Sequence, residues 1–113
     1  MIYTDEMLSI AVSAMQDKKG IDIVSLNIGD ISPVCDAFLI VSGSSRSQVD
    51  ALLDGVEEAM GRADIPLISR EGNSESGWIL LDYGDLVIHI FTSEMREFYN
   101  LEHTWQDAAQ KRY

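Results

Sequence analysis

The sequence predicts an α/β fold of the α+β kind: a mixed five-stranded sheet with flanking helices. Segments with apolar residues at helical spacing alternate with segments in which every second residue is apolar. Residues 37–42 (AFLIVS) are apolar on both faces, as in a central strand covered on two sides. Hydrophobic residues make up 46% of the 113 residues, which is enough for a core. We therefore expect residues 1–113 to form one domain.

The first element is expected to be a helix that begins at Thr4, which can cap it ahead of two acidic residues. Its stop signal is Gly20. The residues expected on its buried face are Leu8, Ala11, Val12 and Met15. Residues 22–28 alternate and are rich in β-branched side chains, so a strand is expected before the central strand at 37–42.

A second helix is indicated by the S-x-x-Q capping box of Ser45 and Gln48. Its expected buried residues are Val49, Leu52, Leu53, Val56, Ala59 and Met60. Residues 65–69 (IPLIS) are expected to form a short strand, and Pro66 suggests that it lies at a sheet edge. Residues 70–76 (REGNSES) are expected to be a polar loop.

The segment from Trp78 to Phe91 predicts a hairpin with Tyr83-Gly84 as a two-residue loop, in which Asp82 faces Asp85. Because side chains alternate along a strand, the hairpin has two different faces. The aliphatic face, expected in the core under helices, carries Ile79, Leu81, Leu86, Ile88 and Ile90. The mixed face carries Trp78, Leu80, Asp82, Asp85, Val87, His89 and Phe91.

Ser93 can cap a third helix over residues 94–99, which is expected to continue with a kink through Trp105. The residues expected to pack it onto the sheet are Phe98, Tyr99, Leu101 and Trp105, and of these Tyr99 is the one that can lie at the surface. Residues 106–113 are expected to be a loosely held tail. This order of elements suggests a crossover through the second helix followed by an antiparallel hairpin.

The charge of the chain bears on its partners. Nineteen acidic residues against eight Lys and Arg give a formal net charge of −11. Proteins bind nucleic acid mainly through basic residues, and the basic pairs Lys18-Lys19 and Lys111-Arg112 are isolated. We therefore expect no direct DNA binding and little or no direct RNA binding. A basic protein partner is favoured, although acidity that only maintains solubility is the alternative explanation.

Several other classes of site and location are not expected. Cys35 is the single cysteine and cannot form an internal disulfide, which indicates a cytoplasmic protein. The N-terminal residues include acids and no basic start, and no apolar run approaches a membrane span, so neither a secretory signal nor a membrane partner is expected. Four-ligand metal spacing is absent, and no cofactor is expected. Gly43-Ser44-Ser45 is interpreted as a helix cap and not as a phosphate site.

The mixed hairpin face is the candidate binding surface, because exposed tryptophan among polar residues is typical of protein interfaces. The alternative for Trp78 is a core position under the first helix. Asp82 and Asp85 can pair with a basic partner or serve turn chemistry. Tyr83 is expected at a solvated turn tip, and His89 is expected to be partly buried and stacked across from Trp78. The candidate partner-binding residues are Trp78, Leu80, Asp82, Tyr83, Asp85, His89 and Tyr99.

Four segments carry a family resemblance, in this order: Lys18-Lys19-Gly20 with Asp22-Ile23; Asp36-Ala37-Phe38 leading to Gly43-Ser44-Ser45-Arg46; Trp78 through Phe91; and Arg96-Glu97-Phe98-Tyr99 through Leu101-Glu102 to Trp105. Together they resemble the ribosomal silencing factors, the RsfS or Iojap family. The match covers almost the whole chain, and its long hairpin and REFYxLE runs are specific.

The resemblance implies a non-enzymatic protein that binds the large ribosomal subunit at ribosomal protein L fourteen. Such a protein would block joining of the small subunit and so lower translation under nutrient limitation. The resemblance also implies a homodimer when free, and a nucleotidyltransferase-like fold without the catalytic carboxylates. Two alternatives remain open. One is a minimal metal-dependent nucleotidyltransferase that uses Gly43-Ser44, and the other is a hairpin face that serves mainly for self-association.

Overall fold

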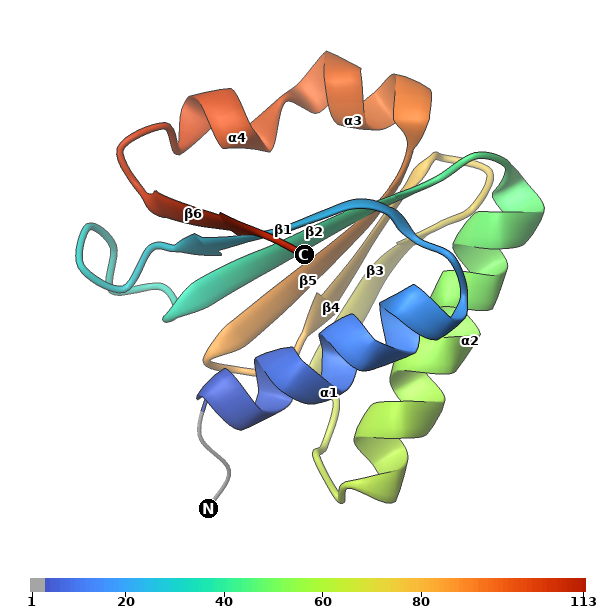
Figure 1. Ribbon diagram of the computed structural model, residues 1–113, viewed down its shortest axis with the longest axis horizontal. Coiled ribbons are helices and arrows are strands. Elements are labelled where there is room, and N and C mark those ends of the chain that lie inside the picture. Colours follow the sequence, from blue (N-terminus) through green and yellow to red (C-terminus); the bar gives the residue numbers. More distant parts are fainter. Residues whose placement is uncertain (1–3) are drawn as a thin grey trace.

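A six-stranded mixed sheet lies between two layers of helices in the computed structural model, which describes residues 4–113 (Figure 1). The expectation about an N-terminal signal falls partly on residues 1–3, outside this range. The elements are α1 (Thr4–Asp17), β1 (Ile21–Asn27), β2 (Ala37–Gly43), α2 (Arg46–Arg62), β3 (Ser69–Asn73), β4 (Trp78–Asp82), β5 (Leu86–Thr92), α3 (Ser93–Tyr99), α4 (Leu101–Thr104) and β6 (Ala109–Arg112). The strand order is β3-β4-β5-β2-β1-β6, in which β2 and β5 are parallel and the other neighbours antiparallel. The predicted fold class is confirmed, with one strand more than expected.

The helices α1 and α2 cover one face of the sheet (Figure 1). Their predicted apolar stripes do face inward, toward the aliphatic side of the β4–β5 hairpin. The fully buried members of this core include Ala11, Met15, Leu52, Met60, Ile79 and Ile88. The predicted cap of α2 is present, since the Ser45 hydroxyl accepts a hydrogen bond from Gln48 N at 3.1 Å. Strand β2 is buried along its whole length, as predicted for a central strand.

The hairpin register differs from the prediction by two residues. Asp82 pairs with Val87 and Leu80 with His89, and Tyr83 N donates to Leu86 O at 2.9 Å. Gly84 and Asp85 therefore form the loop, with Gly84 at φ 92° in the first loop position, where a glycine is favoured. A shift of two residues keeps every side chain on its predicted face, because side chains alternate with a period of two.

The two edge strands were not predicted where they occur. The third strand is β3, most of which lies in the segment expected to be a polar loop. Of residues 65–69, expected to form the strand, only Ser69 belongs to β3, although Ile68 N also donates to Asp82 O at 2.8 Å. The tail expected to be loosely held contains β6, which pairs with β1, and Tyr113 N donates to Ile23 O at 2.9 Å. All residues of both strands are exposed, so neither has the alternating apolar pattern that predicts a strand.

The second face of the sheet is partly covered by α3 and α4 (Figure 1). Thr92, and not Ser93, caps α3, because its hydroxyl accepts from Met95 N at 3.3 Å. The predicted kink is present at Asn100, whose φ of 47° separates the two helices. Leu101 and Trp105 pack against the buried residues of this face as predicted. Phe98 does not, since its side chain points outward and is 75% exposed.

Candidate protein-binding face

The mixed side of the hairpin divides into a covered part and an open part. On β5, Val87, His89 and Phe91 are buried in the second core. On β4, Trp78, Leu80 and Asp82 are only half-buried, and the neighbouring β3 is exposed. The surface formed by Glu71 of β3, by Trp78, Leu80 and Asp82 of β4, and by Tyr99 of α3 is called the open face. Tyr99 closes one side of it. The open face retains five of the seven predicted binding residues if the loop residue Asp85 at its end is included.

Trp78 is held in place within the open face by aromatic contacts and one hydrogen bond. Its ring centroid lies 5.2 Å from that of Phe91, with the planes 22° apart, and 4.4 Å from that of Tyr99. The indole Nε1–H donates to His89 Nδ1 at 3.1 Å. The alternative that Trp78 lies in the core under α1 is wrong, because it points to the opposite side of the sheet. It is a half-exposed aromatic side chain with a fixed orientation.

His89 lies beneath this tryptophan and is only 3% exposed. It stacks against Trp78 with ring centroids 5.8 Å apart, and the Phe38 ring lies 4.7 Å away. Burial lowers the pKa of His89 from 6.5 to about 4, so the ring is neutral at pH 7. Because Nδ1 accepts the indole proton, the imidazole proton is on Nε2. His89 is more deeply buried than predicted, and it reaches the open face only through Trp78.

The two hairpin aspartates have different surroundings and do not face each other. Asp82 Oδ1 accepts a hydrogen bond from Gly84 N at 2.8 Å, so Asp82 stabilises the turn, as its alternative interpretation held. Asp85 is exposed in the loop, and its backbone carbonyl accepts from Asp36 N and Ala37 N. Both carboxylates remain at least partly accessible to a partner.

The prediction for Tyr83 is wrong. Its side chain is 6% exposed and belongs to the core under α1 and α2. Burial, with a smaller contribution from the charge of Glu57, raises the pKa of Tyr83 to about 12. The sequence was misinterpreted here because Tyr83-Gly84 was taken as the loop, whereas Tyr83 is the last paired residue before it.

Glu71 is a residue of the open face that sequence reasoning did not identify. It pairs with Leu80 across β3 and β4, and with Gly72, Ser76, Trp78 and Tyr99 it lines a pocket of about 190 Å³. Within residues 4–113, neither Glu71 nor Asp82 lies within salt-bridge distance of a basic side chain. The available sequence signal was the short segment before Trp78, which is rich in residues that favour turns and is therefore compatible with a hairpin that joins two strands.

A second residue that was missed, Arg96, fixes the helices that border the open face. It is buried, and its Nη1 donates to Ser42 Oγ at 3.0 Å and to Ile21 O at 3.2 Å. It also pairs with Glu102 at 3.5 Å, which joins α3 to α4. The sequence carried no signal for this burial, because Arg96 lies between the charged residues Glu94 and Glu97 of the same helix.

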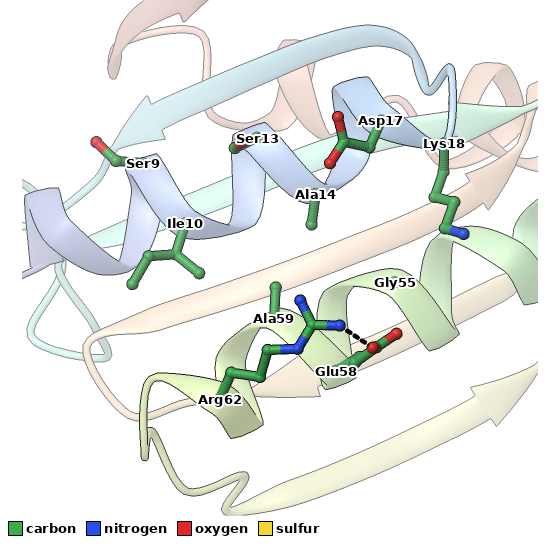
Figure 2. A pocket seen from close by; sticks show the side chains of 10 residues that line it. All are labelled: Ser9, Ile10, Ser13, Ala14, Asp17, Lys18, Gly55, Glu58, Ala59 and Arg62. Carbon is green, nitrogen blue, oxygen red and sulfur yellow. Dashed lines mark hydrogen bonds and ion pairs between the residues drawn. The ribbon is translucent and has the colours of Figure 1, made fainter.

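Two other hollows lie outside the open face. The larger, about 560 Å³, lies between α1 and α2, where its lining includes Asp17, Lys18 and the Glu58–Arg62 ion pair (Figure 2). The other lies beside Ser44, between the starts of α2 and α3, where a nucleotidyltransferase site is expected. In the described part of the chain, no three His, Cys, Asp or Glu side chains gather as metal ligands would. Two carboxylates, those of Glu75 and Glu94, line the hollow beside Ser44.

No helix within residues 4–113 is both long and apolar enough to cross a bilayer.

A profile of the family described as "Ribosomal silencing factor during starvation" matches residues 2–113. The ribosomal silencing factor RsfS of Halalkalibacterium halodurans is 40% identical over 103 residues, which cover 91% of this chain and 88% of that protein. The RsfS of Bacillus subtilis is 40% identical over 102 residues, covering 90% and 86%.

The chloroplastic Iojap protein of Zea mays is 33% identical over 107 residues, which cover 92% of this chain but 46% of that longer protein. Among solved structures, a protein of Chromobacterium violaceum superposes with a TM-score of 0.89 at 28% identity, covering 93% of this chain and 88% of that chain. A protein of Bacillus halodurans superposes with a TM-score of 0.81 at 38% identity, covering 90% and 95%. The mixed sheet with flanking helices is thus shared with solved structures.

Proposed function

This chain belongs to the ribosomal silencing factor family, and from that premise we propose that it represses translation by binding the large ribosomal subunit through ribosomal protein L fourteen. We propose that the open face makes this contact, with Trp78, Leu80, Asp82, Asp85 and Tyr99 on the partner side and His89 supporting Trp78 from below. The bound chain then occupies the place at which the small subunit docks. The site of action is the cytoplasm, under nutrient limitation.

One observation in particular supports this proposal: Trp78 is fixed in orientation yet half-exposed, beside carboxylates that have no basic partner among residues 4–113. Tryptophan is the side chain most often found at the energetic centre of a protein interface. The net charge of −11 complements a basic protein, and opposite charges speed encounter. A specific interface of about 1,200–2,000 Å² would suffice.

Repression of this kind needs no chemistry. If the bound chain and the bound small subunit exclude each other, each weakens the binding of the other by the same factor, because the coupling free energy is reciprocal. The strength of silencing then depends on the affinity for the large subunit and on the concentration of the chain. Repression by exclusion therefore requires no catalytic residue.

Sedimentation of ribosomes tests the proposal. The purified chain, mixed with separated subunits, is expected to move with free large subunits and to be depleted from joined ribosomes. Adding small subunits should displace it, in proportion to their concentration. A chain that stays at the top of the gradient, or that moves equally with joined ribosomes, contradicts the proposal.

We further infer that the free chain forms a homodimer that uses the open face, so that self-association and subunit binding compete. A half-exposed tryptophan beside Leu80 and Tyr99 is the kind of surface that a second copy can cover. Light scattering over a range of concentrations, with wild-type chain and the Trp78→Ala variant, tests this. A dimer that persists unchanged in the variant would place the self-association surface elsewhere.

A further inference from the structure

The small pocket in the open face has the chemistry to bind one particular side chain. Its volume of about 190 Å³ is below the roughly 300–1,000 Å³ typical of sites for whole small molecules. Its lining comes from β3, β4 and α3, within the surface that we assign to partner binding. A pocket of this size at the centre of an interface suits a single long side chain from the partner.

The walls of the pocket are apolar and aromatic. Trp78, Leu80 and Tyr99 form them, with the indole and phenol ring centroids 4.4 Å apart. The hydrogen bond to His89 holds the indole, and Gly72 lets β3 approach closely. A Cβ at Gly72 would lie 2.0 Å from Trp78 O, so no larger residue fits there. The pocket is thus formed before a partner arrives, which lowers the cost of binding.

The rim of the pocket is acidic. Glu71 is exposed and, among the residues that the structure describes, makes no salt bridge. The neighbouring Arg70 does not neutralise it, because Arg70 pairs with Glu57 of α2 at 2.7 Å. The Ser76 hydroxyl already donates to Asn73 O at 2.8 Å. Glu71 is therefore the one charged group that lines the pocket, and it is available to a cation.

We propose that this pocket binds an arginine side chain of the basic partner, with the methylene groups against Leu80, the guanidinium against the aromatic rings, and Glu71 as its counter-ion. An aliphatic side chain would fit the walls but would leave the Glu71 carboxylate partly desolvated and unpaired. Lysine offers a compact, strongly hydrated charge that stacks poorly. Arginine combines an apolar stem, a planar cation that stacks on aromatic rings, and a fork that matches a carboxylate.

The test uses the full chain, labelled with nitrogen-15, and three blocked tripeptides, Gly-Arg-Gly, Gly-Lys-Gly and Gly-norleucine-Gly. The indole N–H signal of Trp78, identified by its loss in Trp78→Phe, reports on binding. The arginine peptide is expected to shift this signal and to bind at least about threefold more tightly than the norleucine peptide, with lysine between them. High salt should reduce the advantage of arginine, because the carboxylate is exposed.

Glu71→Gln is expected to remove the advantage of arginine over norleucine, whereas Glu75→Gln, the same change on the neighbouring loop outside the pocket, should keep it. Equal binding of norleucine and arginine, or an unchanged preference in Glu71→Gln, overturns the proposal. If Glu71→Gln does not fold, the comparison of peptides and the salt dependence of the wild-type chain still decide.

This inference rests on the proposed function only for the identity of the partner. Failure of the chain to sediment with large subunits, together with a peptide preference that depends on Glu71, would contradict the ribosomal role and leave the arginine pocket intact. Sedimentation with large subunits, without any preference for arginine, would contradict the arginine pocket and leave the ribosomal role intact. The two ideas are therefore separable.

Discussion

At the scale of single residues, the partnership of Trp78 and His89 connects the inside of the fold to its binding surface. His89 is buried and neutral, and it presents Nδ1 to the indole N–H. Trp78 is half-exposed, stacks on Phe91 and contacts the tilted ring of Tyr99. A partner that contacts the indole therefore meets a side chain whose orientation is already fixed, so that little conformational entropy is lost on binding.

Replacing Trp78 tests its role at the interface. Trp78→Ala is expected to cost about 2 kcal/mol or more of affinity for the large subunit, as at interface hot spots. Quantitative sedimentation measures this, with circular dichroism to show that the variant is folded. Val34→Ala is the control, because Val34 is also an exposed apolar residue but lies in the β1–β2 loop, away from β4 in the sheet order. A folded Trp78→Ala variant with wild-type affinity would remove Trp78 from the interface.

The buried His89 predicts how stability depends on pH. Its pKa is lowered from 6.5 to about 4 by burial, so between these values the unfolded chain binds the proton more readily than the folded chain. The free energy of unfolding should therefore be fully retained above pH 6.5 and fall as the pH drops toward 4. At roughly 1.4 kcal/mol for each pKa unit, the loss from this group is about 3 kcal/mol.

Urea unfolding at a series of pH values measures the effect of His89. The difference in stability between wild type and His89→Gln should shrink as the pH falls through this window, because glutamine does not titrate. His103→Gln is the matched control, since His103 is exposed on α4 and should leave the wild-type dependence unchanged. A parallel pair of pH curves for wild type and His89→Gln would show that His89 is not the responsible group.

At the scale of secondary-structure elements, the sequence was informative wherever one side of an element is buried. The α2 helix was predicted through its Ser45 cap and apolar stripe, and β4 and β5 through their alternation. The edge strands β3 and β6 escaped prediction because all their residues are exposed and only backbone pairing defines them. The register of the hairpin depended on where its loop lies, and sequence alone does not distinguish a loop at Tyr83-Gly84 from one at Gly84-Asp85.

The same physical limits apply to the candidate site. Trp78 and Leu80 were predictable because they alternate with buried aliphatic residues on β4. Glu71 was not, since it joins them only through the unpredicted pairing of β3 with β4. Tyr83 was misplaced by the same ambiguity in the loop that shifted the register. The coverage of β5 by α3 and α4 also followed from tertiary packing, because the sequence does not indicate how far the helices extend over the sheet.

The α3–α4 segment owes its position to Arg96, which predicts the effect of removing that side chain. Arg96→Ala is expected to lower the free energy of unfolding by about 2–3 kcal/mol, because Glu102 loses its partner in a mostly buried site. Chemical denaturation measures the change. Arg62→Ala breaks an exposed ion pair within α2 and should cost no more than about 0.5 kcal/mol. Equal effects of the two substitutions would show that Arg96 does not anchor the helices.

At the scale of the whole molecule, the charge of −11 and the site of the open face concern different stages of binding. The overall field acts at long range and affects how often the chain meets a basic partner. The open face acts at contact, where Trp78 and its neighbours determine how long the complex lasts. These two contributions respond differently to salt, because screening shortens the range of the field from about 10 Å at 0.1 M to about 3 Å at 1 M.

We therefore predict that salt changes mainly the rate of association with the large subunit, measured by stopped-flow or surface methods with labelled chain. The association rate constant should fall steeply as salt rises, while the dissociation rate constant changes much less. Asp50→Asn, on the exposed side of α2 and outside the open face, should slow association slightly and leave dissociation unchanged. Trp78→Ala should instead raise the dissociation rate constant and leave the association rate constant nearly unchanged, because it removes a contact and not a charge. If salt acted chiefly on dissociation, charged contacts inside the interface, and not the net field of the chain, would dominate recognition.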